Sequence, residues 1–268
     1  MIEIFELNII KRAFLVICLS APIVPLFGIF LLLRRYAFFA DTLAHVGLLA
    51  MALSLLLNIN SLVALIILSI LISVSVEKLR SYGKLPAEGS LSFFLYAGVA
   101  LSVLLLSLSS KTSSVMGILF GSLSTVTVDD LYLIAAGTVF CAFFLIKYYR
   151  QMLNLCIDEE LAHASGINIP ALKLIFAVAV ALSISVSIKT MGALLIGSLM
   201  IIPPLSAMYV TKSLKATAVL SVIYALIAGF FGILFSFYTN VPLGAAISAI
   251  LIGIFVISFS VGLISKSK

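Results

Sequence analysis

The chain has 268 residues, of which 63% are hydrophobic and only 10% are charged, and its mean hydropathy is +1.33. Average proteins carry about 25% charged residues, so this composition excludes a soluble globular domain. Apolar runs of about 20 residues, the length that crosses a bilayer as a helix, recur along the whole chain. Only helices satisfy the backbone of an open chain in lipid, so the sequence predicts an all-α integral membrane protein.

We expect a single transmembrane domain over residues 1–268, built as a polytopic bundle of eight or nine helices. The nine candidate spans are 13–33, 41–58, 60–76, 91–108, 129–147, 171–188, 192–211, 213–237 and 243–263. The second and third are short, so one of them could be re-entrant, which would leave eight. The segment 115–125 is apolar but too short to cross, and could form a half-helix.

The distribution of Lys and Arg predicts the orientation of these spans, because cytoplasmic loops carry the excess of positive charge. One set of loops holds twelve of these residues and the opposite set holds four, at Lys11, Arg12, Lys111 and Lys189. This places the N-terminus outside and the C-terminus in the cytoplasm. The formal net charge of +6 therefore reflects membrane topology and does not indicate a nucleic-acid partner.

The start of the second span carries two ionisable residues, Asp41 and His45. Their spacing of four puts both side chains on one helix face, with Cβ atoms roughly 6 Å apart. A carboxylate oxygen and an imidazole nitrogen that converge in this way suit zinc or manganese. The other interpretation is an Asp that caps the helix and a His that hydrogen-bonds to a neighbour. Spacing alone does not choose between them.

Two further features of the spans have a structural and a functional interpretation. Asp129 and Asp130 begin the fifth span, where a helix N-terminus favours negative charge, so we expect capping. Collection of cations at the outer mouth is the alternative role for them. Pro203 and Pro204 interrupt the seventh span. They remove two backbone donors and predict a break in the helix, which in a transporter would free carbonyl groups near the pathway.

The loop 154–170 predicts a short helix on the cytoplasmic side. Asp158, Glu159 and Glu160 favour its first turn, and Gly166 ends it before Pro170. A connector that lies on the surface would have the same pattern. Glu160, Ala162 and Gly166 also form Glu-x-Ala-x-x-x-Gly, which resembles the helix by which bacterial ABC importer permeases contact their ATPase.

Three stretches together resemble the zinc/manganese-type ABC permease family. Phe39-Ala-Asp-Thr-Leu-Ala-His45 resembles its Asp-Ala-x-Ser-His segment, although Ala44 replaces the usual Ser. The loop 157–170 resembles its coupling region, and 193–204 resembles its apolar span that ends in Ile-Pro. The resemblance covers about residues 13–263. It implies a bacterial inner-membrane importer of two permease copies, two ATPase subunits and an extracytoplasmic metal-binding protein.

The favoured hypothesis is thus a homodimeric conduit for a divalent metal ion, with zinc as the favoured cargo, Asp41 and His45 as ligands and no permanently bound cofactor. The chain lacks Gly-x-x-x-x-Gly-Lys-Ser/Thr, so ATP hydrolysis would belong to a separate subunit. Manganese or iron are alternative cargoes. A self-contained proton-coupled metal transporter and an intramembrane enzyme are the rival classes, and the coupling-like loop argues against the former.

Overall fold

The computed structural model describes residues 8–81, 87–108 and 128–266, and every regular element within these ranges is a helix. The half-helix predicted at 115–125 lies outside the described residues. The helices are α1 (Asn8–Ser20), α2 (Val24–Leu33), α3 (Phe38–Leu57), α4 (Ser61–Ser81), α5 (Ala87–Leu108), α7 (Val128–Ile157), α8 (Glu159–Ala164), α9 (Ile169–Met191), α10 (Ala193–Val210), α11 (Leu214–Thr239) and α12 (Leu243–Lys266).

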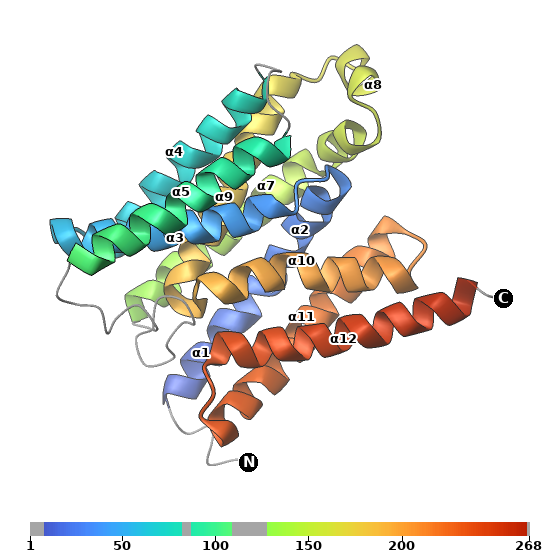
Figure 1. Cartoon of the computed structure of the whole chain (residues 1–268). Coiled ribbons are helices and arrows are strands. Elements are labelled where there is room, and N and C mark those ends of the chain that lie inside the picture. Colours follow the sequence, from blue (N-terminus) through green and yellow to red (C-terminus); the bar gives the residue numbers. More distant parts are fainter. Residues whose placement is uncertain (1–7, 82–86, 109–127, 267–268) are drawn as a thin grey trace.

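Seven segments of the described ranges are long and apolar enough to cross a membrane. The remaining two predicted spans, 129–147 and 192–211, fall in α7 and in the shorter apolar helix α10. The predicted all-helical membrane bundle is therefore confirmed (Figure 1).

The second and third spans are longer than their hydrophobicity predicts. α3 has 20 residues and α4 has 21, which at 1.5 Å per residue gives each about 30 Å, the thickness of a bilayer core. α3 begins before its predicted run, at Phe38, and α4 ends after its predicted run, at Ser81. Neither helix is too short to cross.

The sequence predicts one continuous helix over 13–33, whereas the structure divides it into α1 and α2. The division lies at Pro22, which has no N–H and disfavours helical conformation at the residue before it. Pro25 then stands in the first turn of α2, where a missing donor costs nothing. This correction thus has a local cause in two prolines.

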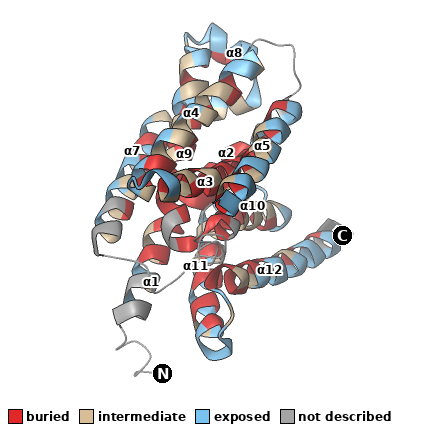
Figure 2. Cartoon of the chain, turned by 60° about the vertical axis from the view of Figure 1, so that its left-hand side comes forward, coloured by how far each residue is buried: buried red, intermediate tan, exposed pale blue. Residues whose placement is uncertain are grey.

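The core lies where α2, α3, α9 and α10 cross, and Figure 2 shows buried residues concentrated there. At its centre, the ring of Phe27 on α2 lies 6.1 Å from that of Phe144 on α7 and 6.0 Å from that of Phe176 on α9. The outer surfaces of α5 and α12 instead expose large apolar side chains, including Val103, Leu104, Ile257 and Ile264. An apolar outer surface of this kind suits contact with lipid.

α10 continues as one helix through Pro203 and Pro204, so the break predicted there is limited to two missing donors. Pro204 cannot donate to the carbonyl of Met200, four residues earlier. α2 packs directly against this carbonyl at Gly28, which has no side chain. A Cβ at this position would lie 1.7 Å from Met200 O. The carbonyl freed by the proline is thereby covered by α2 rather than open to a pathway.

Gly28→Ala should destabilise the fold, because its new methyl group would meet backbone and not a side chain that can rotate away. We expect a loss of at least about 1–3 kcal/mol. The loss of stability is measured as a fall in melting temperature, which is the temperature at which half of the monodisperse peak is lost in size-exclusion chromatography. Gly253→Ala on α12 is the matched control, since a Cβ there meets no atom within 4 Å. Equal melting temperatures for both variants would contradict the packing described.

Candidate functional site

Asp41 and His45 both lie on α3, as predicted, with Asp41 in the first turn. The N-cap position of this helix is Ala37, and it makes no side-chain capping bond. Asp41 is therefore not the N-cap residue. The His45 imidazole lies within electrostatic range of the Asp41 carboxylate, as the spacing of four requires.

The carboxylate of Asp41 lies against α10 at Gly197. A Cβ at position 197 would stand 2.4 Å from Asp41 Oδ1, far inside van der Waals contact. The neighbouring residue, Ser198, has its hydroxyl 2.8 Å from that of Ser248 on α12. This link holds α10 to α12 beside the point at which α3 crosses it. The carboxylate thus occupies space that only glycine leaves open.

The opposite side of the same segment is packed by α5. A Cβ at Gly98 would lie 3.2 Å from the carbonyl carbon of His45, and Thr42 Oγ1 donates to Leu91 O of α5 at 3.2 Å. His45 is half-buried, and its buried Nδ1 has no hydrogen-bond partner within the described part of the chain. Buried polar atoms are normally paired, so this nitrogen is available to a ligand. The second interpretation of the sequence, a hydrogen-bonded histidine, finds no support at Nδ1.

The pair lies between the two ends of α9. α9 begins beside α8, where Lys173 and Glu159 form an ion pair, and extends for 23 residues, about 34 Å, to the opposite end. A Cβ at Gly47 of α3 would meet the side chain of Ile188, near the far end of α9. Asp41 precedes Gly47 by six residues, or about 9 Å along α3, so it lies on the α8 side of this contact.

In the part of the chain that the structure describes, one copy brings only two candidate ligands together here. No group of three or more His, Cys, Asp and Glu side chains in the described ranges could hold a metal ion. A closed tetrahedral zinc site uses about four ligands, so the pair by itself is an open site.

The predicted short helix of the cytoplasmic loop is present as α8, at one end of the molecule (Figure 1). Asp158 is its N-cap and accepts hydrogen bonds from the amides of Glu160 and Leu161 at 2.8 and 3.1 Å. Ala162 is fully buried, which anchors one face of α8. Glu159 pairs with Lys173, while Glu160 and His163 are exposed.

Gly166 ends α8 in the left-handed conformation, with φ of +78°. Its amide donates to His163 O at 3.0 Å and that of Ile167 donates to Ala162 O at 3.3 Å. These two bonds form a Schellman motif, which explains why a glycine stands there. Leu161, overlooked in the sequence, is 62% exposed on the outer face of α8. An exposed leucine beside an acidic residue is a surface suited to a protein partner.

Arg34 and Glu77 directly follow the predicted spans 13–33 and 60–76, and the structure buries both. Their side chains are 5% and 7% exposed, and Arg34 Nη2 lies 3.7 Å from Glu77 Oε1. Burial lowers the pKa of Arg34, and the neighbouring Glu77 carboxylate partly offsets this effect. Nothing in the local sequence signals their burial, which results from the packing of the α2–α3 connection against α4.

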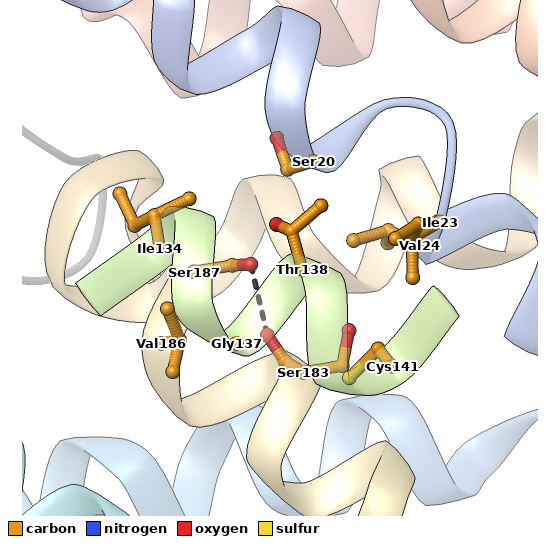
Figure 3. A pocket seen from close by; sticks show the side chains of 10 residues that line it. All are labelled: Ser20, Ile23, Val24, Ile134, Gly137, Thr138, Cys141, Ser183, Val186 and Ser187. Carbon is orange, nitrogen blue, oxygen red and sulfur yellow. Dashed lines mark hydrogen bonds between the residues drawn. The ribbon is translucent and has the colours of Figure 1, made fainter. Parts of the chain in front are cut away.

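A small cavity lies beside the turn between α1 and α2, lined by the hydroxyl-bearing residues Ser20, Thr138, Ser183 and Ser187 (Figure 3). Its volume of about 10 Å³ is close to that of a single water molecule. It contains no carboxylate or imidazole. The cavity is therefore separate from the Asp41–His45 pair.

Comparison with known proteins identifies the family. Residues 6–262 match the ABC 3 transport family. A probable metal transport system membrane protein of Treponema pallidum is 32% identical, over 87% of this chain and 88% of its own. The high-affinity zinc uptake system membrane protein ZnuB of Buchnera aphidicola is 33% identical, over 86% and 88%.

A more distant relative, the manganese import system permease protein ScaB of Streptococcus gordonii, is 22% identical over 95% of this chain and 91% of its own. The solved structure of PsaBC from Streptococcus pneumoniae in complex with Fab has the same fold, with a TM-score of 0.85 over 97% of this chain and 95% of that one, at 22% identity. The chain therefore belongs to the ABC 3 transport family, as a multi-pass transport subunit of the bacterial inner membrane that leaves ATP hydrolysis to a separate ATPase.

Proposed function

We propose that the chain imports a divalent metal ion, with zinc as the principal cargo, and that the Asp41–His45 pair is the binding site on the pathway. The observation that carries this proposal is the pair itself: a carboxylate and an unpartnered imidazole nitrogen on one face of α3, where this helix meets α10. Placing an ionisable pair inside a membrane costs several kcal/mol of insertion free energy, so such residues are usually kept for a function.

The donor set supports a borderline metal. One oxygen and one nitrogen suit zinc, and also manganese or iron, while hard cations such as Ca²⁺ prefer oxygen alone. The zinc proposal rests on the relatives, because those named for zinc are about a third identical, whereas the manganese permease is 22% identical. Manganese and iron remain the alternative cargoes.

Two ligands from one chain require completion from elsewhere. In a homodimer, a second Asp41 and His45 could complete four ligands if both α3 helices line a shared pathway. Water could instead fill the shell of an ion held by each copy. Either arrangement binds more weakly than a closed structural site, as a conduit requires, because an ion must leave as well as enter.

α8 supports an ATPase partner and disfavours a self-contained proton-coupled transporter. This helix lies at one end of the bundle with Glu160 and Leu161 exposed. The buried Ala162 and the Glu159–Lys173 ion pair hold it in place. We assign Asp158, Glu159, Glu160, Ala162 and Gly166 to a segment that transmits ATPase movement to the bundle. An extracytoplasmic metal-binding protein would deliver the ion to the other end.

Asp41→Asn and His45→Ala should each lower metal uptake at least about a hundredfold, because each removes one of two ligands. Uptake of radiolabelled zinc and manganese by cells that express equal amounts of each variant measures this. The assembled complex should remain in the membrane, as co-purification of the ATPase would show. Wild-type uptake by both variants would exclude the pair as the transport site.

Gly197→Ala should impair uptake while leaving stability nearly unchanged. Its new methyl group would meet the end of the Asp41 side chain, which can rotate away, and not backbone. The displaced carboxylate binds metal less well, so the metal concentration for half-maximal uptake should rise about tenfold. Gly253→Ala is again the control. An unaltered uptake curve, or a fall in melting temperature like that expected of Gly28→Ala, would count against this role.

Gly166→Leu should uncouple ATP hydrolysis from transport, because a branched side chain at φ of +78° costs about 1–2 kcal/mol and strains the end of α8. Gly166→Asn is the matched variant, since asparagine tolerates this conformation. The ratio of metal imported to ATP hydrolysed in reconstituted vesicles should fall for Leu and stay near wild type for Asn. Equal ratios for both would contradict the coupling assignment.

A further inference from the structure

The strongest unassigned feature is a polar cluster at the α8 end of the bundle, formed by Arg34, Tyr36, Glu77 and Arg80. Arg34 lies over the ring of Phe176, with 5.4 Å from Cζ to the centroid, and Arg80 lies over the ring of Tyr36 at 4.6 Å. Tyr36 is only 2% exposed. Two guanidinium groups are thus held largely out of water by aromatic rings, with one carboxylate beside them.

This polar cluster has more hydrogen-bond donors than acceptors. Within the described ranges, Arg34 Nη1, Arg34 Nη2 and Arg80 Nη1 are buried without an acceptor. The ion pair does not satisfy them, because 3.7 Å between Arg34 Nη2 and Glu77 Oε1 is too long for a hydrogen bond. Two groups that can accept, Glu77 Oε2 and the hydroxyl of Tyr36, are left unpaired beside these three donors. The missing partner is therefore one rich in acceptor oxygens.

A hollow of about 690 Å³ opens next to the polar cluster, between the end of α4, α8 and the start of α9. Glu77 and Arg80 line it, together with Lys78, Lys173 and Glu159. Three cationic side chains, Lys78, Arg80 and Lys173, therefore line the hollow with two carboxylates, one of which is already paired with Lys173. Its size is within the range of small-ligand pockets, and its charge favours an anion.

The outer face of α4 leads from lipid to this hollow. Val63, Ile67 and Leu71 are 48%, 59% and 55% exposed and follow one another at intervals of four, which makes them one apolar stripe. Lys78, seven residues after Leu71, continues the same face and is exposed at its end. A cation at the end of a lipid-facing stripe lies where phospholipid headgroups lie.

We propose that the hollow binds a phosphate oxyanion, supplied by the headgroup of an anionic phospholipid whose acyl chains lie along the apolar stripe of α4. The phosphate oxygens would accept from the guanidinium group of Arg80 and from the ammonium groups of Lys78 and Lys173. Such a group would connect the end of α4 and the start of α9 at one point.

The test uses the full-length chain in nanodiscs of phosphatidylcholine alone or with added phosphatidylglycerol. Native mass spectrometry should show phosphatidylglycerol retained on the wild-type chain, and its melting temperature by circular dichroism should rise. Arg80→Gln and Lys78→Gln should each reduce retention about fivefold, since each removes one cation. Lys78 is exposed, so its variant tests the site even if Arg80→Gln fails to fold. Lys215→Gln, an exposed cation on α11, is the control.

A second arm separates the two sources of phosphate. Inorganic phosphate is added to the phosphatidylcholine nanodiscs, with chloride at matched ionic strength as the reference. If free phosphate raises the melting temperature of the wild type but not of the Arg80 and Lys78 variants, while phosphatidylglycerol has no effect, the result would support the oxyanion site and overturn the lipid as its source. Equal retention by wild type, Arg80→Gln and Lys78→Gln, or equal loss in Lys215→Gln, would overturn the site. None of these readouts depends on metal transport.

Discussion

The contact between the Asp41 carboxylate and Gly197 is the constraint on which the site depends. It requires α3 and α10 to cross closely at one point. The crossing in turn requires the start of α3 to lie inside the protein, and the buried Arg34 and Tyr36 put it there. A membrane protein has weak hydrophobic drive between its helices, so such close contacts through small residues carry much of its packing.

Much of the bundle follows from elementary physics of the bilayer. Apolar runs of sufficient length predict the helices of the described ranges, and Asp158 and Gly166 predict both ends of α8 through the chemistry of helix caps. The conformational preferences of proline also explain the division between α1 and α2 at Pro22. Hydropathy alone does not reveal this division, because the apolar run continues across it. Features set by neighbours in sequence are thus the ones that sequence predicts best.

The features that sequence did not predict depend on which helix meets which. The spacing of Asp41 and His45 identifies the pair, but the role of Gly197, 156 residues beyond Asp41, appears only when α10 is placed against α3. Arg34 and Glu77 likewise resemble ordinary flanking charges until the α2–α3 connection is seen to be buried. Leu161 reads as one more apolar residue among many. The role of each of these residues depends on tertiary contacts, and the neighbouring sequence contains no pattern that indicates it.

The pair of Asp41 and His45 lies at a seam between two sets of helices. α3 is tied to α5 by the Thr42–Leu91 hydrogen bond and by close packing at Gly98. α10 is tied to α12 by Ser198 and Ser248, and to α2 by the covered carbonyl of Met200. Between the two sets, the Asp41 carboxylate contacts the backbone at Gly197. In the described ranges this carboxylate accepts no hydrogen bond that would join α3 to α10. A relative shift of the two sets would change the surroundings of Asp41 while leaving these other contacts intact. Because Tyr36 stacks on Phe39 at 5.2 Å, two residues before Asp41, a displacement at the α8 end has a short path of packed side chains to that seam.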